Sequence, residues 1–348
     1  MNQKSRVAAC LVVAVSFGIC LRAQNPAATI ANGKVKATLY LPDSKDGYYR
    51  GTRFDWSGVV RNLEYAGHDL YGPWYERIDA KVSDYIYDGT DIVAGPCTSM
   101  MGVPEEFTTN NSALGWDEAK VGGMFIKIGV GVLRKPDDRP YDLFRLYDIV
   151  DGGKWTVRKT ANSVEFTQEL ADPTTGYAYV YRKRVSLTLG KPQMVLEHSL
   201  HNTGKLPIRS VVYDHNFMRM DHQAPGPEIA IKMPFQAQPV QPLDTNLVEF
   251  RGNQINFTKQ LSDKDHVMVP FQGFGADSRD YDFRIENQKL GIGIRITGDR
   301  PIARASVWGI RAVFAVEPFV DITIEPGSEF TWKITYDYYT IPKDAPQQ

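Results

Sequence analysis

An all-β fold is predicted by three features of the sequence. Short segments rich in Val, Ile, Tyr, Phe and Thr recur through most of the chain, and clusters of Gly, Pro, Asn or Asp separate them. No long stretch shows helical periodicity with caps at its ends. Gly-containing turn sequences stand between neighbouring strand-like segments. This combination is typical of antiparallel sheets packed against one another.

The predicted strands follow one another along most of the chain. In order they are residues 35–41, 122–133, 143–149, 163–169, 178–189, 193–201, 209–218, 291–297, 312–317 and 329–339. At most one short helical turn is expected, at residues 262–268. The turns Asp151-Gly152-Gly153-Lys154 and Asn202-Thr203-Gly204-Lys205 each separate two predicted strands, so we expect an antiparallel hairpin at each.

A cleavable signal peptide is predicted at residues 1–23. Two basic side chains precede an apolar run at 7–21 that is too short to span a bilayer comfortably, and Ala23 offers the small residue preferred at a cleavage point. A lipid anchor at Cys20 is the weaker interpretation, because the three preceding residues do not end in the usual small side chain. We therefore expect soluble export, to the periplasm or outside the cell, with no membrane anchor after cleavage.

The composition excludes several classes of protein. Lys and Arg (40) nearly balance Asp and Glu (41), so no nucleic-acid partner is expected. Cys97 is the one cysteine beyond the predicted signal, which excludes an intramolecular disulfide in the mature chain. Without a long linker, a composition shift or an internal repeat, residues 28–341 are predicted to form a single β domain, followed by a disordered tail at 342–348.

Motifs for cofactors are missing from the sequence. It has no phosphate-binding loop, dinucleotide fingerprint, zinc-ligand spacing or nucleophile elbow, so neither a cofactor nor a metal is expected. Five histidines show no metal-ligand spacing and are interpreted as surface or structural residues: His68, His198, His201, His222 and His266.

The segment 213–217 is unusual, because polar residues interrupt a β-rich run. Alternation along a strand puts Tyr213, His215 and Phe217 on one face, and Asp214 with Asn216 on the other. A histidine between two aromatic rings is typical of surfaces that bind sugars, where rings cover the C–H face and polar groups reach the oxygens. The alternative interpretation is a structural histidine on an edge strand.

Glu317 is the second candidate for chemistry. It ends the apolar run 312–316 and precedes Pro318, and alternation places it on the face of Val313 and Ala315. Burial on that face would raise the carboxyl pKa toward the range of a general base. The alternative is a strand-end glutamate that turns into water.

Taken together in chain order, these segments resemble the galactose mutarotase-like family, which includes the aldose 1-epimerases and hexose-6-phosphate mutarotases. The similar segments are residues 50–56, the turn 196–207, the strand 213–217, the Val316-Glu317-Pro318 strand and the closing turn 324–330. The resemblance implies a β-supersandwich of antiparallel sheets. It also implies an enzyme that interconverts the anomers of a sugar without a cofactor, and the predicted signal peptide adds that this enzyme is exported.

The resemblance assigns roles to particular residues. Glu317 would take the proton of the anomeric hydroxyl, while protonated His215 donates one to the ring oxygen, so that the hemiacetal opens and recloses on either face. Further contacts to the carbohydrate substrate are expected from Arg53, Tyr213, Asn216, Asp282 and Trp308. Asp221 is the other acid considered for the position given to Asp282, and Trp56 and Trp74 are further residues that could stack on the sugar ring.

Two other functions remain open at the level of sequence. One is a non-catalytic carbohydrate-binding or envelope-glycan module on the same fold. The other is a polysaccharide lyase that uses a histidine or tyrosine base against a uronic acid. A single concave pocket with His215 facing Glu317 would favour the epimerase, whereas a long open groove lined by aromatic rings would favour glycan binding or cleavage.

Overall fold

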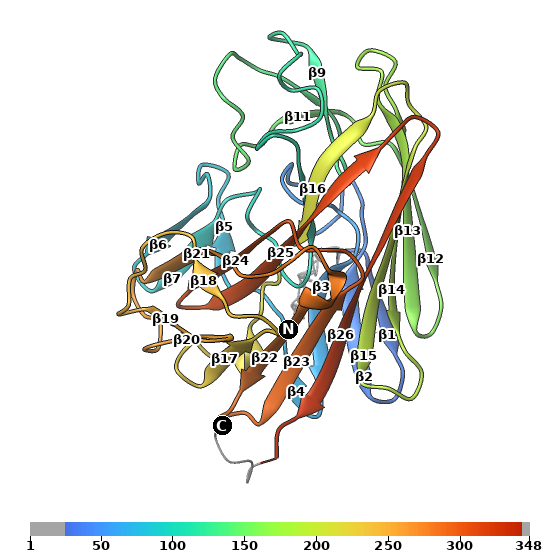
Figure 1. Cartoon of the computed structure of the whole chain (residues 1–348). Helices are drawn as coiled ribbons and strands as arrows, with labels where there is room; N and C mark the ends of the chain where they lie inside the picture. The colour runs from blue at the N-terminus through green and yellow to red at the C-terminus, as the bar shows by residue number, and fades with distance from the viewer. Residues whose placement is uncertain (1–24, 343–348) are drawn as a thin grey trace, which may run out of the picture.

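Two large β-sheets dominate the computed structural model, which describes residues 25–342 (Figure 1). The larger sheet has ten antiparallel strands in the order β12 (Lys154–Lys159), β13 (Ser163–Ala171), β14 (Ala178–Leu187), β15 (Gln193–Asn202), β26 (Glu329–Thr340), β23 (Ile292–Gly298), β22 (Asp282–Asn287), β17 (Ile229–Lys232), β20 (Gln254–Phe257) and β19 (Val248–Arg251). The second sheet has six, in the order β18 (Gln238–Pro239), β21 (His266–Gln272), β24 (Arg304–Ile310), β25 (Val313–Ile324), β16 (Ile208–Asp214) and β8 (Glu105–Thr108).

Three small sheets complete the fold. They are β1 (Ala27–Ala31), β2 (Val35–Tyr40), β3 (Val59–Tyr65) and β4 (His68–Asp69); β11 (Asp148–Asp151), β10 (Gly131–Arg134) and β9 (Met124–Lys127); and β5 (Arg77–Ile78), β7 (Asp91–Ala94) and β6 (Tyr85–Asp88). The helical elements among the described residues are two short 3₁₀ turns, η1 (Met220–His222) and η2 (Ser278–Asp280). No helix within residues 25–342 is both long enough and apolar enough to cross a membrane.

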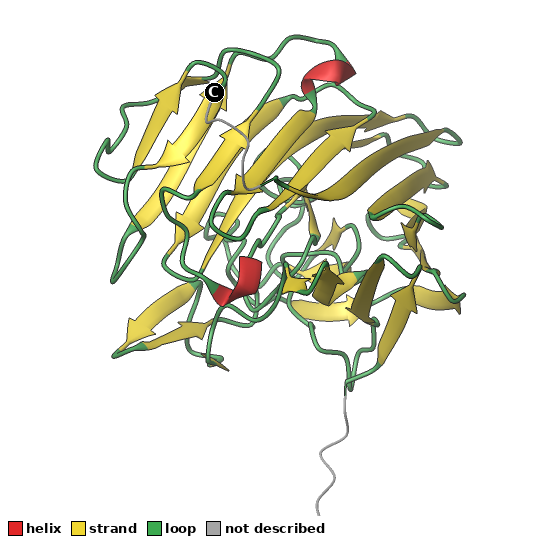
Figure 2. Cartoon of the chain, turned by 90° about the horizontal axis from the view of Figure 1, so that it is seen from below, coloured by secondary structure: helices red, strands yellow, loops and turns green. Residues whose placement is uncertain are grey.

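The two large sheets pack face to face, and Figure 2 shows the larger one as a broad curved layer. Strands of the larger sheet alternate between buried and more exposed side chains, as in β14, where Tyr179, Tyr181 and Val185 are buried. This alternation is expected of a strand with one face on a core. Phe107 of the second sheet contacts Tyr181 and Trp332 of the larger one edge-to-face. The predicted all-β architecture of antiparallel sheets is therefore confirmed.

Several predicted elements need correction. The strand predicted at 122–133 is two strands, β9 and β10, because a turn with Gly129 at φ 78° reverses the chain. The strand predicted at 143–149 begins only at Asp148. Residues 262–268 form no helix; a turn leads into strand β21, which starts at His266.

Neither predicted hairpin forms. The turn at residues 151–154 joins β11 to β12, which lie in different sheets, and the turn at 202–205 joins β15 in the larger sheet to β16 in the second. Both turns reverse the chain, as their glycines predict, but each carries it from one sheet to another. The predicted signal peptide at 1–23 and all but the first residue of the predicted tail lie outside the described residues.

Candidate active site

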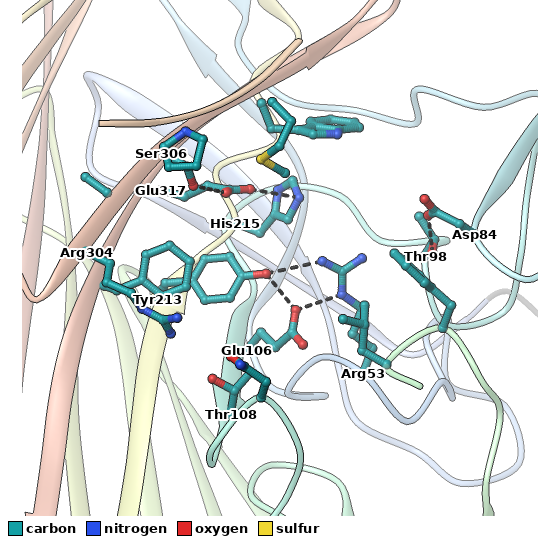
Figure 3. Close-up of a pocket in the computed structure, with 18 of the residues that line it drawn as sticks. Arg53, Asp84, Thr98, Glu106, Thr108, Tyr213, His215, Arg304, Ser306 and Glu317 are labelled. Carbon is teal, nitrogen blue, oxygen red and sulfur yellow. Dashed lines mark hydrogen bonds and ion pairs between the residues drawn. The ribbon is translucent and has the colours of Figure 1, made fainter. Parts of the chain in front are cut away.

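The second sheet carries a cavity of about 540 Å³ on the face turned away from the larger sheet (Figure 3). Strand alternation sorts the residues of β16 and the segment that follows it: Tyr213, His215 and Phe217 line the cavity, whereas Asp214 and Asn216 contact Tyr336 of the larger sheet. The volume lies within the range usual for small-molecule sites.

His215 and Glu317 meet inside this cavity. Their closest atoms, Nε2 of His215 and Oε1 of Glu317, are 3.1 Å apart, and both side chains are about 95% buried. The other carboxylate oxygen, Oε2, accepts a hydrogen bond of 2.6 Å from Ser306 Oγ. Register explains the second contact, because Ser306 is the cross-strand partner of Glu317 between β24 and β25. These three side chains form what we call the inner row.

Burial displaces the pKa values of the two groups in opposite directions. It raises the pKa of Glu317 to about 7, although the hydrogen bond from Ser306 and the charge of Arg53 oppose the change. Burial, together with the charge of Arg53, lowers the pKa of His215 well below its ordinary value. The imidazole is therefore neutral at pH 7, and the first proton that the pair takes up goes to the carboxyl group. This order of protonation is the reverse of the expected one, in which protonated His215 acts as the acid and Glu317 as the base.

Aromatic rings hold the imidazole in place. His215 stacks on Phe217, with ring centroids 3.8 Å apart and planes inclined by 9°. Phe54 and Trp308 contact it edge-on. These rings cover the imidazole and contribute to the burial of the pair.

A second polar cluster at the cavity consists of Tyr213, two residues before His215, and the side chains of Glu106, Arg53 and Lys127. Tyr213 donates a hydrogen bond of 2.6 Å to Oε2 of Glu106, which also accepts one of 2.7 Å from Nε of Arg53. Lys127 Nζ lies 3.6 Å from the other oxygen of Glu106. Burial alone would raise the pKa of Glu106, but the charges of Arg53 and Lys127 outweigh it and keep the pKa below its ordinary value. Glu106 is thus ionised, and its single charge is shared between Arg53 and Lys127.

A buried ionic network lies directly behind the cavity, between the two large sheets. Glu105 contacts Lys183 and His198, whose Nε2 is 2.5 Å from the carboxylate, while Asp55 accepts hydrogen bonds from Ser57 and Tyr181. Since neighbouring residues of a strand point to opposite faces, Glu105 faces this network and Glu106 faces the cavity. The network fixes the strands that carry the candidate site.

The structure brings together most, but not all, of the predicted site residues. Arg53, Tyr213 and Trp308 line the cavity with His215 and Glu317. Asn216 does not, because it is buried on the opposite face, where its amide donates to the carbonyl oxygen of Val316.

Three further residues considered from the sequence lie elsewhere. Asp282 lies in β22 of the larger sheet, in an ion pair of 2.7 Å with Arg295, and Asp221 accepts a hydrogen bond from the backbone of Asp69. Trp74 is buried, and its indole donates to the carbonyl oxygen of Met100.

Other cavity residues were missed from the sequence. His266, interpreted as surface or structural, lines the cavity, as do Asp84, Ser306 and Arg304. Alternation along 304–308 is the signal that could have placed Arg304 and Ser306 on the face of Trp308. Glu106 had no such signal, because its neighbour Glu105 is equally acidic and strand β8 is short. Within residues 25–342, no group of three or more His, Cys, Asp or Glu side chains is arranged to hold a metal ion.

Comparison with known proteins identifies the fold. No protein-family model matches the chain, and no curated protein matches it by sequence. Among solved structures, a putative aldose 1-epimerase from Escherichia coli K12 superposes with a TM-score of 0.53 at 13% identity, over 90% of this chain and 99% of the other. An aldose epimerase homologue from C. elegans gives 0.52 at 15% identity, over 90% and 99% of the two chains. A galactose mutarotase-like protein from Lactobacillus casei gives 0.51 at 13% identity, over 90% and 100%.

These similarities confirm the galactose mutarotase-like fold predicted from the sequence. At such low identity they establish the fold alone, and function has to be argued from the cavity.

Proposed function

We propose that this protein is an aldose 1-epimerase-like enzyme, which interconverts the anomers of a sugar by opening and reclosing its ring. The observation that carries the proposal is the contact of 3.1 Å between His215 and Glu317 inside a cavity of small-molecule size. Ring opening removes a proton from the anomeric hydroxyl and adds one to the ring oxygen as the bond between that oxygen and the anomeric carbon breaks. Both oxygens are bonded to one carbon, so an acid and a base side by side can reach them together.

The pair can carry out this exchange with one mobile proton. With the proton on Glu317, the carboxyl group donates to the ring oxygen while neutral His215 accepts the proton of the anomeric hydroxyl. The pair is then a carboxylate and an imidazolium, which are the groups required for the second half of the cycle, reclosure on either face. Matched acid and base contributions of roughly a hundredfold or more each are typical of such catalysis.

The test is anomer exchange measured by NMR on the chain purified without residues 1–23, with common hexoses and pentoses as substrates. We expect accelerated exchange with at least one aldose, and a loss of about a hundredfold or more in Glu317→Gln and in His215→Asn. Asp282→Asn is the matched control, since this carboxylate lies in the other sheet, and it should keep the full rate. Exchange at the uncatalysed rate with every sugar would overturn the proposal, and sugar binding without exchange would favour the carbohydrate-binding module.

The lyase alternative has weaker support from the cavity. A lyase needs a tyrosine or histidine ready to accept a proton and a free cation beside that base. Burial raises the pKa of Tyr213 well above its ordinary value, and its hydroxyl already donates to Glu106. Of the two cavity arginines, Arg53 is paired with the same carboxylate, and Arg304 stacks on Phe319, two residues along β25 from Glu317, so neither is a free cation beside His215.

We also propose that the protein acts after export, in the periplasm or outside the cell. The support is the predicted signal at residues 1–23. Mass spectrometry of the protein from its native host should find a mature N-terminus at Gln24. An uncleaved or lipid-modified chain would contradict soluble export.

A further inference from the structure

Arg304, an exposed residue at the start of β24, stands in a stacked row of planar groups that line the cavity. Its cross-strand partner in β25 is Phe319, which in turn pairs with Tyr213 of β16. The rings of Tyr213 and Phe319 stack with centroids 4.2 Å apart, and the guanidinium carbon of Arg304 lies 4.8 Å from the centroid of Phe319. A guanidinium held against a ring keeps its N–H edge free and oriented. We call these three side chains the outer row.

The charge of Arg304 is not neutralised by the protein. Among residues 25–342, no carboxylate lies within 4.0 Å of its guanidinium, and no hydrogen bond from it is formed. The other cavity arginine, Arg53, is paired with Glu106. Asp84 lies on the far side of the cavity from Arg304, as Figure 3 shows, and it accepts a hydrogen bond from Thr98. Arg304 therefore offers one unpaired positive charge to whatever enters.

The outer row lies at a fixed distance from the His215–Glu317 pair. Arg304 and Ser306, and likewise Phe319 and Glu317, are two residues apart on the same strand face. This spacing separates the two rows by roughly 7 Å. A single pyranose ring fits this separation, with its anomeric carbon at the inner row and the substituent of the carbon on the other side of the ring oxygen at the outer row.

We propose that Arg304 binds a carboxylate on that substituent, so that the substrate class is the aldohexuronic acids. The proposal rests on the proposed function, because it uses the inner row to place the anomeric carbon. A planar carboxylate matches the two parallel N–H groups of a guanidinium. Its single negative charge matches the single positive charge of Arg304.

The experiment compares the anomer-exchange kcat/KM for glucuronic acid, glucose and glucose 6-phosphate. The wild-type protein should prefer glucuronic acid, and Arg304→Gln should reduce the ratio of glucuronic acid to glucose by about tenfold or more, the effect expected from losing a charge-assisted hydrogen bond. Arg182→Gln, a substitution of an exposed arginine on β14 of the other sheet, is the matched control and should leave the ratio unchanged. Thermal melting should show both variants folded.

The outcomes separate this proposal from the one on which it rests. An equal effect of Arg304→Gln on glucuronic acid and glucose, with exchange still catalysed, would overturn the carboxylate site and leave the epimerase standing. An Arg304-dependent preference for glucose 6-phosphate over glucuronic acid would replace the carboxylate by a phosphate. If no sugar is turned over, binding of glucuronic acid measured by NMR titration still decides: binding that weakens in Arg304→Gln supports the site, and binding that does not weaken overturns it.

Discussion

Glu317 and His215 are buried to nearly the same extent, and this shared burial makes them complementary. Desolvation penalises the charged form of each group, which is the carboxylate for Glu317 and the imidazolium for His215. The carboxyl pKa therefore rises to about 7 while the imidazole pKa falls. The neutral pair holds one proton in acid-to-neutral solution, and a contact of 3.1 Å lets that proton move between the two groups.

A pH dependence follows for the proposed exchange reaction. The working form of the pair carries one proton, so kcat/KM should be constant just below pH 7 and fall about tenfold per unit above it, as Glu317 loses its proton. The measurement is the pH profile of anomer exchange by NMR, corrected for the buffer-catalysed rate. An increase in rate through pH 7 would contradict the one-proton form.

Ser306→Ala offers a matched variant for the same profile. The hydrogen bond from Ser306 lowers the pKa of Glu317, so removing it should move the break in the profile to higher pH. A break that stays in place would show that another group titrates there.

The residue scale also shows which parts of the site were predictable. His215 and Glu317 stood out because a polar side chain in an apolar strand must have a partner. Arg53 was assigned through a family resemblance, and its partner Glu106 was not predicted. The sequence does not reveal whether Glu105 or Glu106 faces the cavity, because that depends on how β8 pairs with β16.

At the scale of elements, strands β8 and β16 each present one face to the cavity and the other to the buried ionic network. Their register sets Tyr213 opposite Glu106 and Asp214 opposite Glu105. A slip of one residue would exchange the two faces and bury the site side chains in the core. The network therefore helps to hold the register on which the site depends.

The turn between β9 and β10 supports the same network. Gly129 has φ 78°, and a Cβ there would lie 2.7 Å from Cβ of Asp55. Gly129→Ala should reduce the free energy of unfolding by about 2–5 kcal/mol, from the left-handed backbone and the overpacking together. Urea denaturation monitored by fluorescence measures the loss.

Gly122→Ala is the matched control for that substitution. Its φ is 82°, but a Cβ there meets nothing within 4 Å. The loss should be only the backbone part, about 1–2 kcal/mol. Equal losses in the two variants would show that the contact with Asp55 costs nothing.

Element boundaries were predicted well where one face of a strand is buried and poorly where sheets change. The segment 193–201 agrees with β15 because its side chains alternate strictly. The turns at 151–154 and 202–205 carry glycines suited to a reversal of the chain. Such residues predict that the chain reverses, but not which sheet the next strand joins. Whether the next strand joins the same sheet is decided by distant partners, which a single sequence does not reveal.

At the scale of the whole molecule, strand β26 joins the two halves of the larger sheet. On one side it pairs with β15 and on the other with β23, and both ladders are antiparallel. The strands from β12 to β15 have no other ladder to the strands from β23 to β19. The core contributed by Trp332, Ile334, Tyr336 and Tyr338 lies on this one strand.

A chain that ends after residue 328 should therefore not fold. Removing β26 exposes two unpaired strand edges and leaves the core without four large buried side chains. We expect the truncated chain to be insoluble, or to lack a cooperative unfolding transition, when it is compared with the full chain by circular dichroism. A soluble truncated chain with a sharp transition would refute this role of β26.

The central place of β26 also bears on the order of events during synthesis. The ribosome makes this strand after every other strand of the sheet, so the nascent polypeptide cannot close its sandwich while earlier segments emerge. Until residues 329–340 have left the exit tunnel, β15 and β23 each have one edge without its pairing strand. Factors that bind extended polypeptides can therefore engage the earlier strands until β26 has emerged.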